Sequence, residues 1–472
     1  MKKYIIFLIP AIVLVCLTLY KSFEAPITHD EAFSYEVYSS KNIKSILSFK
    51  EDVSANNHIV NTLFMKLISG IGFEQAGMLR LLSSISFLIF LISAFLMTKD
   101  EKNIASSSLY LFACCNPYLL DFFSMARGYG ISFALMTLSL YLFLTFEDKN
   151  KNFWSMQIAT LGMLSNFNLV YFWASFGILH LFQFVRTRNF ETEILKKQIF
   201  TYLFPAISIF YLIVVFKRLT EAQQLYFGGH SGIIEDLVND QFWCIIYDKN
   251  YSRNSLFLSI WHSVPILMIL SSTLLAFFKE IRNKKSYKNW ISVLFILVFS
   301  FFMIELNHRL SGSLYPIKRT GLFMSILLSI SFILMMKFLT EIKYLKIPII
   351  FISYISIGLL FYHTITSFDS KKYREVPYDS HHHEILAKLQ NEVKDEKTEL
   401  DFSANWQVGP ALNFYKKTKF LNWLPKTGRD KIRSNAKYLL VFDEDLENLN
   451  MDSLEIQLSY PNEGLHLLKR IN

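Results

Sequence analysis

Residues 4–20 read YIIFLIPAIVLVCLTLY, and residues 26–35, which follow almost at once, read PITHDEAFSY. The first stretch is apolar enough for a transmembrane helix, which needs about 20 predominantly apolar residues. The second places His29, Asp30 and Glu31 just beyond the end of that helix. Acidic residues beside a helix end are often only solvated, but a carboxylate that faces a cavity at a membrane surface can act as a general base.

The rest of the chain repeats the composition of the first stretch. Of its 472 residues, 52% are hydrophobic, 18% are charged and 45 are Phe. We count about eleven apolar stretches of transmembrane length. They lie near residues 4–20, 76–98, 106–124, 130–146, 153–167, 169–185, 199–216, 256–278, 290–306, 320–340 and 347–366. The expected fold class is an α-helical polytopic membrane protein, with a tight outer turn at residues 165–168.

The basic residues predict how the chain is oriented. The net charge is +9, but Lys and Arg fall in short clusters between the apolar stretches and do not form one patch for nucleic acid. Lys2 and Lys3 precede the first stretch, and no A-x-A-like cleavage site follows it, which favours an uncleaved helix. We expect a bacterial plasma-membrane protein with a cytoplasmic N-terminus and an extracytoplasmic C-terminus.

Three long segments, 21–75, 217–254 and 367–472, then fall on the outer face. We expect a membrane domain over residues 1–366, which includes the first two segments, and a soluble α/β domain over 367–472. In the first segment, Ile59–Phe73 is expected to be a helix lying in the membrane interface. The tail is expected to contain a helix at 380–396 and a strand at 438–442.

The tail has two open questions. His381, His382 and His383 suggest metal binding, although a His run on a polar helix is more often solvated. Trp406, Tyr415 and Trp423 either contact an acceptor glycan or form the core of this domain. The four Cys residues show no C-x-x-C spacing, so we expect neither a disulfide framework nor a zinc site.

Further candidate site residues stand at the outer ends of the apolar stretches. His58 follows Asn57 before the interfacial helix, and Asp121, Arg127 and Tyr129 lie between the third and fourth stretches. Asp121 and Arg127 either pair with each other or serve a site. Another group, Arg309, Lys318 and Arg319, breaks the positive-inside trend in a short outer loop. Headgroup contact is one explanation, and binding of a phosphate is the other, because Arg presents a planar fork to its oxygens.

These carboxylates and basic residues, all expected on one face, suit a reaction between a phosphate-bearing lipid and an acceptor. The chain resembles the GT-C superfamily of membrane glycosyltransferases, of the protein O-mannosyltransferase and lipid A aminoarabinose-transferase type. The motifs that carry the resemblance lie in roughly the first 150 residues. They are Thr28-His29-Asp30-Glu31-Ala32, Asn57-His58, Leu79-Arg80-Leu81-Leu82-Ser83, and Asn116-Pro117 through Ala126-Arg127-Gly128-Tyr129.

The resemblance implies inverting transfer of a hexose or pentose from a polyprenyl-phosphate donor to a glycan, lipid or protein hydroxyl on the outer face. It implies that Asp30, with its neighbour Glu31, is catalytic, and that Arg127 and Arg319 lie on the phosphate side. The chain departs from many relatives at Ile59, Met125 and Thr320, where they have Pro, Glu and Tyr. A divalent cation is neither required nor excluded.

Two other functions remain open from the sequence. A lipid or solute transporter also places charges near membrane cavities, but such proteins often show paired halves with broken helices, and we find no such halves. A glycan polymerase or ligase would use a diphosphate-linked donor on the same face.

Overall fold

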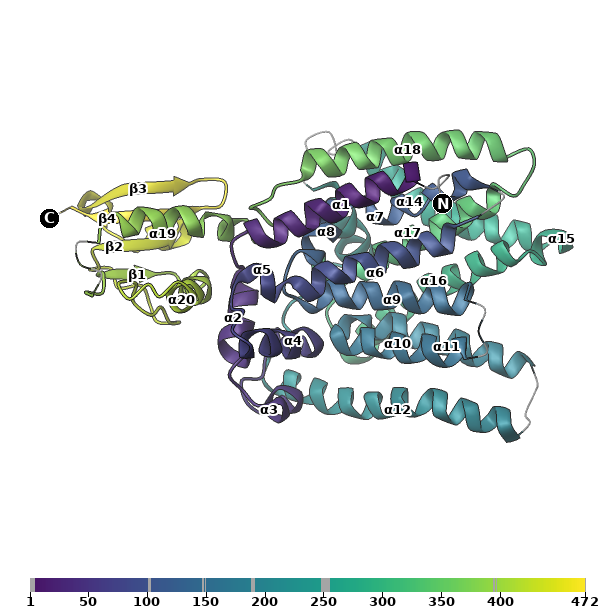
Figure 1. Ribbon diagram of the computed structural model, residues 1–472, viewed down its shortest axis with the longest axis horizontal. Helices are drawn as coiled ribbons and strands as arrows, with labels where there is room; N and C mark the ends of the chain where they lie inside the picture. Colours follow the sequence, from purple (N-terminus) through teal and green to yellow (C-terminus); the bar gives the residue numbers. More distant parts are fainter. Residues whose placement is uncertain are drawn as a thin grey trace. The chain divides into compact units, whose positions relative to one another are not determined.

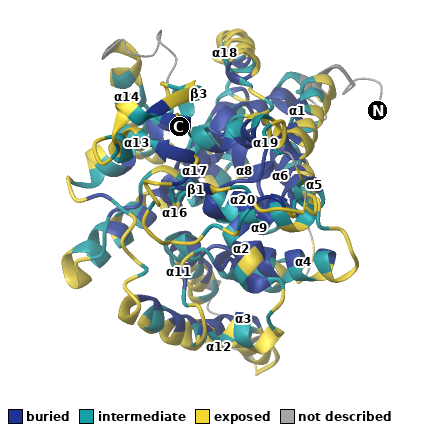
Figure 2. Cartoon of the chain, turned by 90° about the vertical axis from the view of Figure 1, so that its left-hand side faces the viewer, coloured by how far each residue is buried: buried dark blue, intermediate teal, exposed yellow. Residues whose placement is uncertain are grey.

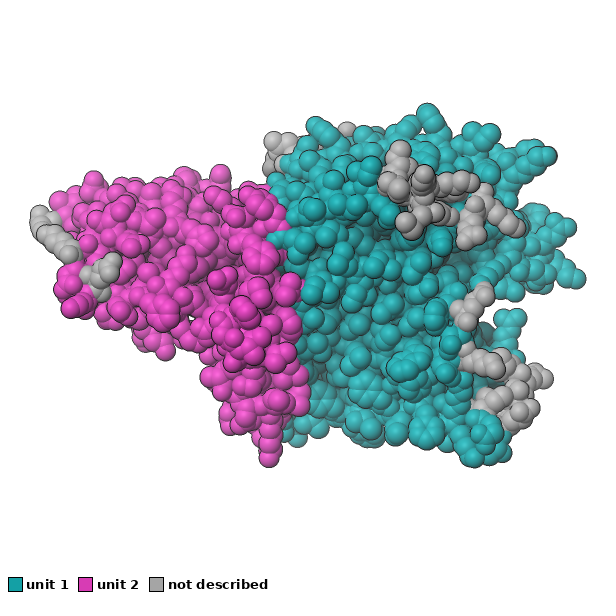
Figure 3. All heavy atoms as spheres, in the orientation of Figure 1, with its two compact units in different colours: residues 1–19, 53–60, 82–368 teal, residues 20–52, 61–81, 369–472 magenta. Residues whose placement is uncertain are grey.

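The computed structural model describes residues 5–100, 103–146, 148, 150–187, 192–247, 255–393, 395 and 397–471 (Figure 1). It divides into two compact units (Figure 3). Unit 1 comprises residues 1–19, 53–60 and 82–368, and unit 2 comprises residues 20–52, 61–81 and 369–472. Much of the first outer segment, residues 20–52 and 61–81, belongs to unit 2 together with residues 369–472. The predicted division after residue 366 stays a prediction. Residues 248–254 of the second outer segment lie outside the described residues.

Unit 1 is helical. Its elements, some of which extend into unit 2, are α1 (Ile5–Glu24), α6 (Leu81–Thr98), α7 (Leu111–Cys114), α8 (Pro117–Phe123), α9 (Gly128–Leu144), α10 (Lys151–Ser165), α11 (Val170–Thr187), α12 (Thr192–Glu221), α13 (Asp240–Ile246), α14 (Ser255–Ala276), α15 (Lys279–Arg282), α16 (Lys285–Ser311), α17 (Lys318–Leu339) and α18 (Lys346–Ser367). Short 3₁₀ turns at Ile104–Ser108 and Phe167–Leu169 and a π turn at Ile234–Asn239 connect them.

The apolar helices identify a multi-pass membrane protein. In the described part of the chain, seven helices are long and apolar enough to cross a membrane, or up to nine if each of two bent pairs is one span. Large apolar side chains are exposed along α12, where Ile199 is 67% and Phe210 72% exposed. Figure 2 shows exposed residues along α12, α14 and α18. Such helices are stable where lipid replaces water around them.

The third predicted span, 106–124, is not one helix, which is one reason the count falls below eleven. Asn116 caps α8 by accepting a hydrogen bond from Leu119 N at 3.2 Å, and Pro117, which has no N–H to donate, begins the helix. After Phe123 the chain leaves the helical path, and α9 begins at Gly128 at 108° to α8. The expected turn at 165–168 is confirmed: α10 ends at Ser165 and α11 begins at Val170.

Unit 2 joins short helices to a small sheet. Its helices are α2 (His29–Tyr38), α3 (Ile43–Ser48), α4 (Ile59–Gly70), α5 (Ala76–Leu79), α19 (His382–Gln390), α20 (Gly409–Thr418) and α21 (Asp443–Leu446). The strands are β1 (Phe402–Ala404), β2 (Tyr438–Phe442), β3 (Leu454–Tyr460) and β4 (Leu465–Arg470), in the order β1-β2-β4-β3. β1 and β2 are parallel, and β4 is antiparallel to β2 and to β3.

The α/β character of the tail is therefore confirmed. The predicted strand at 438–442 is β2, and its residues 438–441 are buried, as expected of a central strand. The predicted helix at 380–396 is shorter, because regular α-helix covers only His382–Gln390 and a 3₁₀ turn precedes it. α4 confirms a helix from Ile59, ending at Gly70.

Candidate active site

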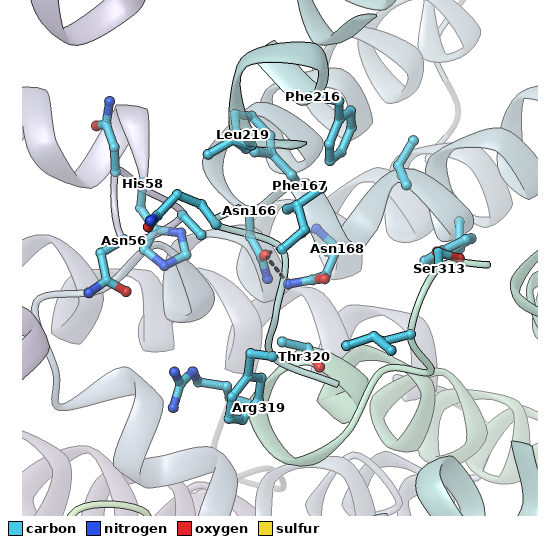
Figure 4. A pocket seen from close by; sticks show the side chains of 18 of the residues that line it. Asn56, His58, Asn166, Phe167, Asn168, Phe216, Leu219, Ser313, Arg319 and Thr320 are labelled. Atoms are coloured by element: carbon cyan, nitrogen blue, oxygen red, sulfur yellow. Dashed lines mark hydrogen bonds between the residues drawn. The ribbon is translucent and has the colours of Figure 1, made fainter. Parts of the chain in front are cut away.

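A cavity of about 890 Å³ lies within unit 1 (Figure 4). Its walls come from the ends of several helices, namely the N-terminal ends of α9, α11 and α17 and the C-terminal ends of α10, α12 and α16. The polar lining includes Asn56, His58, Arg127, Tyr129, Asn166, Asn168, Tyr171, Asn307, Arg319 and Thr320. The apolar lining includes Leu164, Phe167, Val170, Phe216, Leu219, Phe227 and Met303. The cavity thus combines two cations with neutral hydrogen-bonding groups and an apolar wall.

Arg127 is positioned by the break between α8 and α9. It is the N-cap residue of α9, with an extended backbone (φ −131°, ψ 157°), and its carbonyl accepts a hydrogen bond from Ser83 Oγ at 3.2 Å. Its Nη2 donates to Asn56 Oδ1 at 3.2 Å, and its guanidinium carbon lies 5.8 Å from the centre of the Tyr129 ring. A continuous helix through residues 106–144 would have kept this side chain on a helix surface; the break brings it to the cavity.

His58 is packed tightly against the first residue of α9. Its ring lies 4.9 Å from the Tyr129 ring in an edge-on arrangement. A Cβ atom added at Gly128 would lie 2.1 Å from the carbonyl oxygen of Ser165 and 2.7 Å from His58 Cβ. Glycine at residue 128 therefore allows the loop that carries His58, the end of α10 and the start of α9 to meet.

Arg319 enters the cavity from the first turn of α17, directly after the loop 312–317. This loop is fixed by two hydrogen bonds between Gly229 and Tyr315, of 2.9 and 3.1 Å, and by stacking of His308 on Tyr315 at 4.1 Å. The guanidinium carbon of Arg319 lies 4.4 Å from the centre of the Phe227 ring. Arg319 is the second residue of a 22-residue helix, so it stands at the positive end of the helix dipole.

Asparagine side chains line part of the cavity wall. Asn166 Oδ1 accepts hydrogen bonds from the backbone N–H of Asn168 at 3.2 Å and from Asn168 Nδ2 at 3.1 Å (Figure 4). Asn307 Nδ2 donates to Tyr171 Oη at 2.9 Å. These residues are not among those predicted from the sequence. Asn166 and Asn168 belong to the turn predicted at 165–168, and Asn307 lies near the end of α16.

The structure therefore brings together four of the predicted site residues, His58, Arg127, Tyr129 and Arg319. Asp121 is buried, and its Oδ2 accepts a hydrogen bond from Tyr247 Oη at 2.9 Å. Arg309 is exposed and donates to Glu305 Oε1 at 2.7 Å on its own helix. Lys318 is exposed, and its backbone N–H donates to Asp240. These contacts give Asp121, Arg309 and Lys318 structural partners.

The other two predicted residues, Asp30 and Glu31, belong to unit 2 and lie in the first turn of α2. Thr28 caps this helix in a reciprocal arrangement: Thr28 N–H donates to Glu31 Oε2 at 2.9 Å, and Glu31 N–H donates to Thr28 Oγ1 at 3.4 Å. Glu31 has no exposed surface, whereas Asp30 is partly exposed.

Arg80 completes the support of this turn. Its Nε and Nη2 donate to the two carboxylate oxygens of Glu31 at 2.8 and 2.7 Å. Its remaining N–H groups donate to the backbone carbonyls of Ser22, Ala25 and Pro26 at 2.7–3.0 Å. All five guanidinium donors are thus used. Both carboxylate oxygens of Glu31 are bound by Arg80, which is expected of a residue with a structural role in the loop. The catalytic role predicted for Asp30 and Glu31 stays a prediction.

The histidines at residues 381 and 382 take part in the packing of unit 2. His382 Nε2 lies 2.9 Å from Asp379 Oδ1, and Asp379 Oδ2 accepts a hydrogen bond from His29 N–H at 2.9 Å. His381 stacks on Tyr460, and burial lowers its pKa, although Glu463 acts in the opposite direction. No group of three or more His, Cys, Asp or Glu residues within the described ranges is arranged to hold a metal ion.

Fold and site together define a multi-pass helical membrane protein with an arginine-lined cavity. No protein-family model and no curated protein matches the sequence. Among solved structures, the chain is similar to ArnT from Cupriavidus metallidurans in the apo state (TM-score 0.41, 9% identity, 99% of this chain and 97% of that chain covered). It is also similar to the same protein bound to undecaprenyl phosphate (TM-score 0.40, 9% identity, 98% and 97% covered).

Proposed function

We propose that the chain is a membrane glycosyltransferase that moves a sugar from a polyprenyl-phosphate donor to an acceptor hydroxyl, with inversion, on the outer face of the membrane. The observation that carries the proposal is the cavity of unit 1, where Arg127 and Arg319 stand beside an apolar wall. A ligand with a phosphate group and an apolar chain complements both features, because its phosphate can bind the arginines and its chain can lie on the apolar wall.

The local electrostatics favour a phosphate. Arg127 is the residue directly before α9 and Arg319 lies in the first turn of α17, so each cation stands near helix N–H groups and the positive end of a dipole. Charge-assisted hydrogen bonds from arginine to phosphate are short and about twice as strong as neutral ones. Phe216, Leu219 and Phe227 supply the apolar wall for the first part of an isoprenoid chain.

The residues then have separate roles in one displacement step. Asp30 accepts the proton of the acceptor hydroxyl as its oxygen attacks the anomeric carbon. The bond between the anomeric carbon and the phosphate oxygen breaks, and the phosphate leaves with the bonding electrons. Arg127 and Arg319 stabilise the negative charge that develops on this leaving group. Attack opposite the leaving phosphate inverts the configuration of the sugar.

The distribution of basic residues supports the proposed orientation. The helix ends that line the cavity lie at the opposite ends of their helices from Lys151, Arg186, Lys197, Lys285 and Lys337. By the positive-inside rule the basic ends face the cytoplasm, so we place the cavity toward the outer leaflet.

The experiment is to measure release of free polyprenyl phosphate. Membranes that carry wild type, Asp30→Asn, Arg127→Gln or Arg309→Gln are incubated with polyprenyl-phosphate sugars and an acceptor extract. We expect release with wild type and Arg309→Gln, and strongly reduced release with Asp30→Asn and Arg127→Gln. No release by correctly inserted wild type, together with turnover of diphosphate-linked donors, would favour the polymerase or ligase. Full activity of Asp30→Asn would exclude its role as the base.

A further inference from the structure

Unit 2 carries a group of aromatic and cationic side chains, exposed or half-buried, to which the proposed reaction step assigns no role. Trp406 is 45% exposed, and the guanidinium carbon of Arg429 lies 5.8 Å from the ring centres of both Trp406 and Phe33. We call Phe33, Trp406 and Arg429 the aromatic platform. Trp423 and Tyr415, by contrast, are only 2% and 3% exposed and belong to the core.

Trp406 is presented by a fixed turn. On one side, the Asn405 N–H donates to the Leu440 carbonyl at 2.9 Å, and Asn405 Nδ2 donates to Asp445 Oδ2 at 2.8 Å. On the other side, the Gln407 N–H donates to Asn405 Oδ1 at 2.9 Å. Because both neighbours are held, the backbone that carries this indole is already ordered before a ligand binds, which lowers the entropic cost of binding.

α2 places the platform beside Asp30. Phe33 follows Asp30 by three residues in α2, so the two side chains are neighbours on the helix surface. The His29 ring lies 5.7 Å from the Trp406 ring, and its Nδ1 lies 2.5 Å from the Gln407 carbonyl oxygen. Since a carbonyl oxygen only accepts, Nδ1 is the donor in this contact, which fixes the ring beside Trp406.

The loop that carries Arg429 is basic. Residues 425–433 read PKTGRDKIR, with four basic residues and one acidic residue. Lys426 lies 3.6 Å from Glu36, and Arg433 lies 3.2 Å from Asp401, so these two cations have carboxylate partners. Arg429 instead lies over two aromatic rings, an arrangement in which the edge of its planar fork can donate to a carboxylate or phosphate.

We propose that the aromatic platform binds the acceptor, and that the acceptor is an anionic saccharide. A sugar ring lies with its apolar face on Trp406 and Phe33, and its carboxylate or phosphate group is bound by Arg429. A hydroxyl of this ring is then presented to Asp30. This inference rests on the proposed function, because it assigns the acceptor side of the same reaction.

Binding is measured directly, with the full chain in nanodiscs and no donor present. Isothermal titration calorimetry gives the dissociation constants of three oligosaccharides of equal length. One is neutral, one contains uronic acid and one is phosphorylated. We expect wild type to bind at least one anionic oligosaccharide at least tenfold more tightly than the neutral one. Trp406→Ala weakens this binding about fivefold to tenfold, and Trp406→Phe weakens it less. Phe420→Ala, which removes another exposed aromatic ring of unit 2 (83% exposed), leaves it unchanged.

The charge is tested in the same way. Arg429→Gln removes the preference for the anionic oligosaccharide, and Lys397→Gln, at another exposed residue of unit 2, keeps it. Equal binding by wild type, Trp406→Ala and Phe420→Ala, or no binding of either anionic oligosaccharide by wild type, overturns the inference. Binding that depends on the aromatic platform, without turnover of any donor, would support the binding site but reject the glycosyltransferase function. Sugar transfer that is insensitive to Trp406→Ala would support the glycosyltransferase function but reject the binding site.

Discussion

Two arginines, one in each unit, show how differently the same side chain is used. Arg80 in unit 2 is completely buried, and its five donors are taken up by Glu31 and three backbone carbonyls. Arg127 in unit 1 is nearly as buried, at 3% exposure, but it lines a cavity and donates to the neutral amide of Asn56. Burial alone therefore does not identify a functional arginine. The cavity beside the Arg127 guanidinium distinguishes it from Arg80.

The largest effect on activity is expected at Asp30, which precedes Glu31 in the first turn of α2. Asp30→Asn keeps the size of the side chain but removes the proposed base, so we expect transfer to fall by about 100-fold to 10,000-fold. Initial rates of polyprenyl phosphate release measure this loss. The melting temperature of the purified variant is the control, and it stays near that of wild type because Thr28, Glu31 and Arg80 still hold the turn.

Arg80→Met tests the structural side of the comparison. It leaves the Glu31 carboxylate buried without its cation, which destabilises unit 2 by about 3–5 kcal/mol. Thermal unfolding in detergent reports the loss as a lower melting temperature. A variant as stable as wild type would show that the network does not hold unit 2 together.

Arg127→Gln tests the functional side. It keeps an amide donor for Asn56 but removes the charge, so release of polyprenyl phosphate falls by about 100-fold to 1,000-fold while stability changes little. Arg309→Gln is the matched control, because Arg309 is exposed and paired with Glu305. Equal losses in the two variants would indicate a general effect of charge on the membrane domain.

A smaller effect is expected at Gly128. Gly128→Ala pushes a methyl group against the Ser165 carbonyl and His58, which costs about 1–3 kcal/mol of stability. The displaced His58 and Arg127 also reduce activity, although neither side chain has been changed. Melting temperature and release rate are measured together, with Gly358→Ala, where a Cβ meets no atom within 4 Å, as the control.

Much of the fold could be predicted because bilayer thickness sets the length of an apolar helix. Regular helix was found at most of the predicted stretches, and β2 lies where the strand was expected. The interrupted third span was not predicted, because its apolar composition continues through Asn116 and Pro117. The cap at Asn116 and the sharp bend before Gly128 depend on local hydrogen bonds and packing that hydropathy does not report.

The candidate site was predicted less completely. The arginines could be recognised as candidate site residues, because a charged side chain near a membrane span is costly unless it has a partner or binds a ligand. The sequence did not show which of the arginines would line the cavity, since Arg309 and Arg319 are close in sequence and only Arg319 lies in its lining. The asparagines at residues 166, 168 and 307 gave no separate signal, because polar residues in turns are common. The support of Glu31 by Arg80 joins residues 49 apart, a pairing that no local pattern contains.

The proposed function requires that the cavity of unit 1 bind the phosphate of a lipid-linked donor. Its most direct test is binding of polyprenyl phosphate itself to the full chain in nanodiscs, with wild type, Arg127→Gln/Arg319→Gln and Arg309→Gln side by side. We expect wild type and Arg309→Gln to bind alike, and the double variant to bind at least 100-fold more weakly. Equal affinity in all three proteins would contradict the claim and remove the phosphate from this cavity.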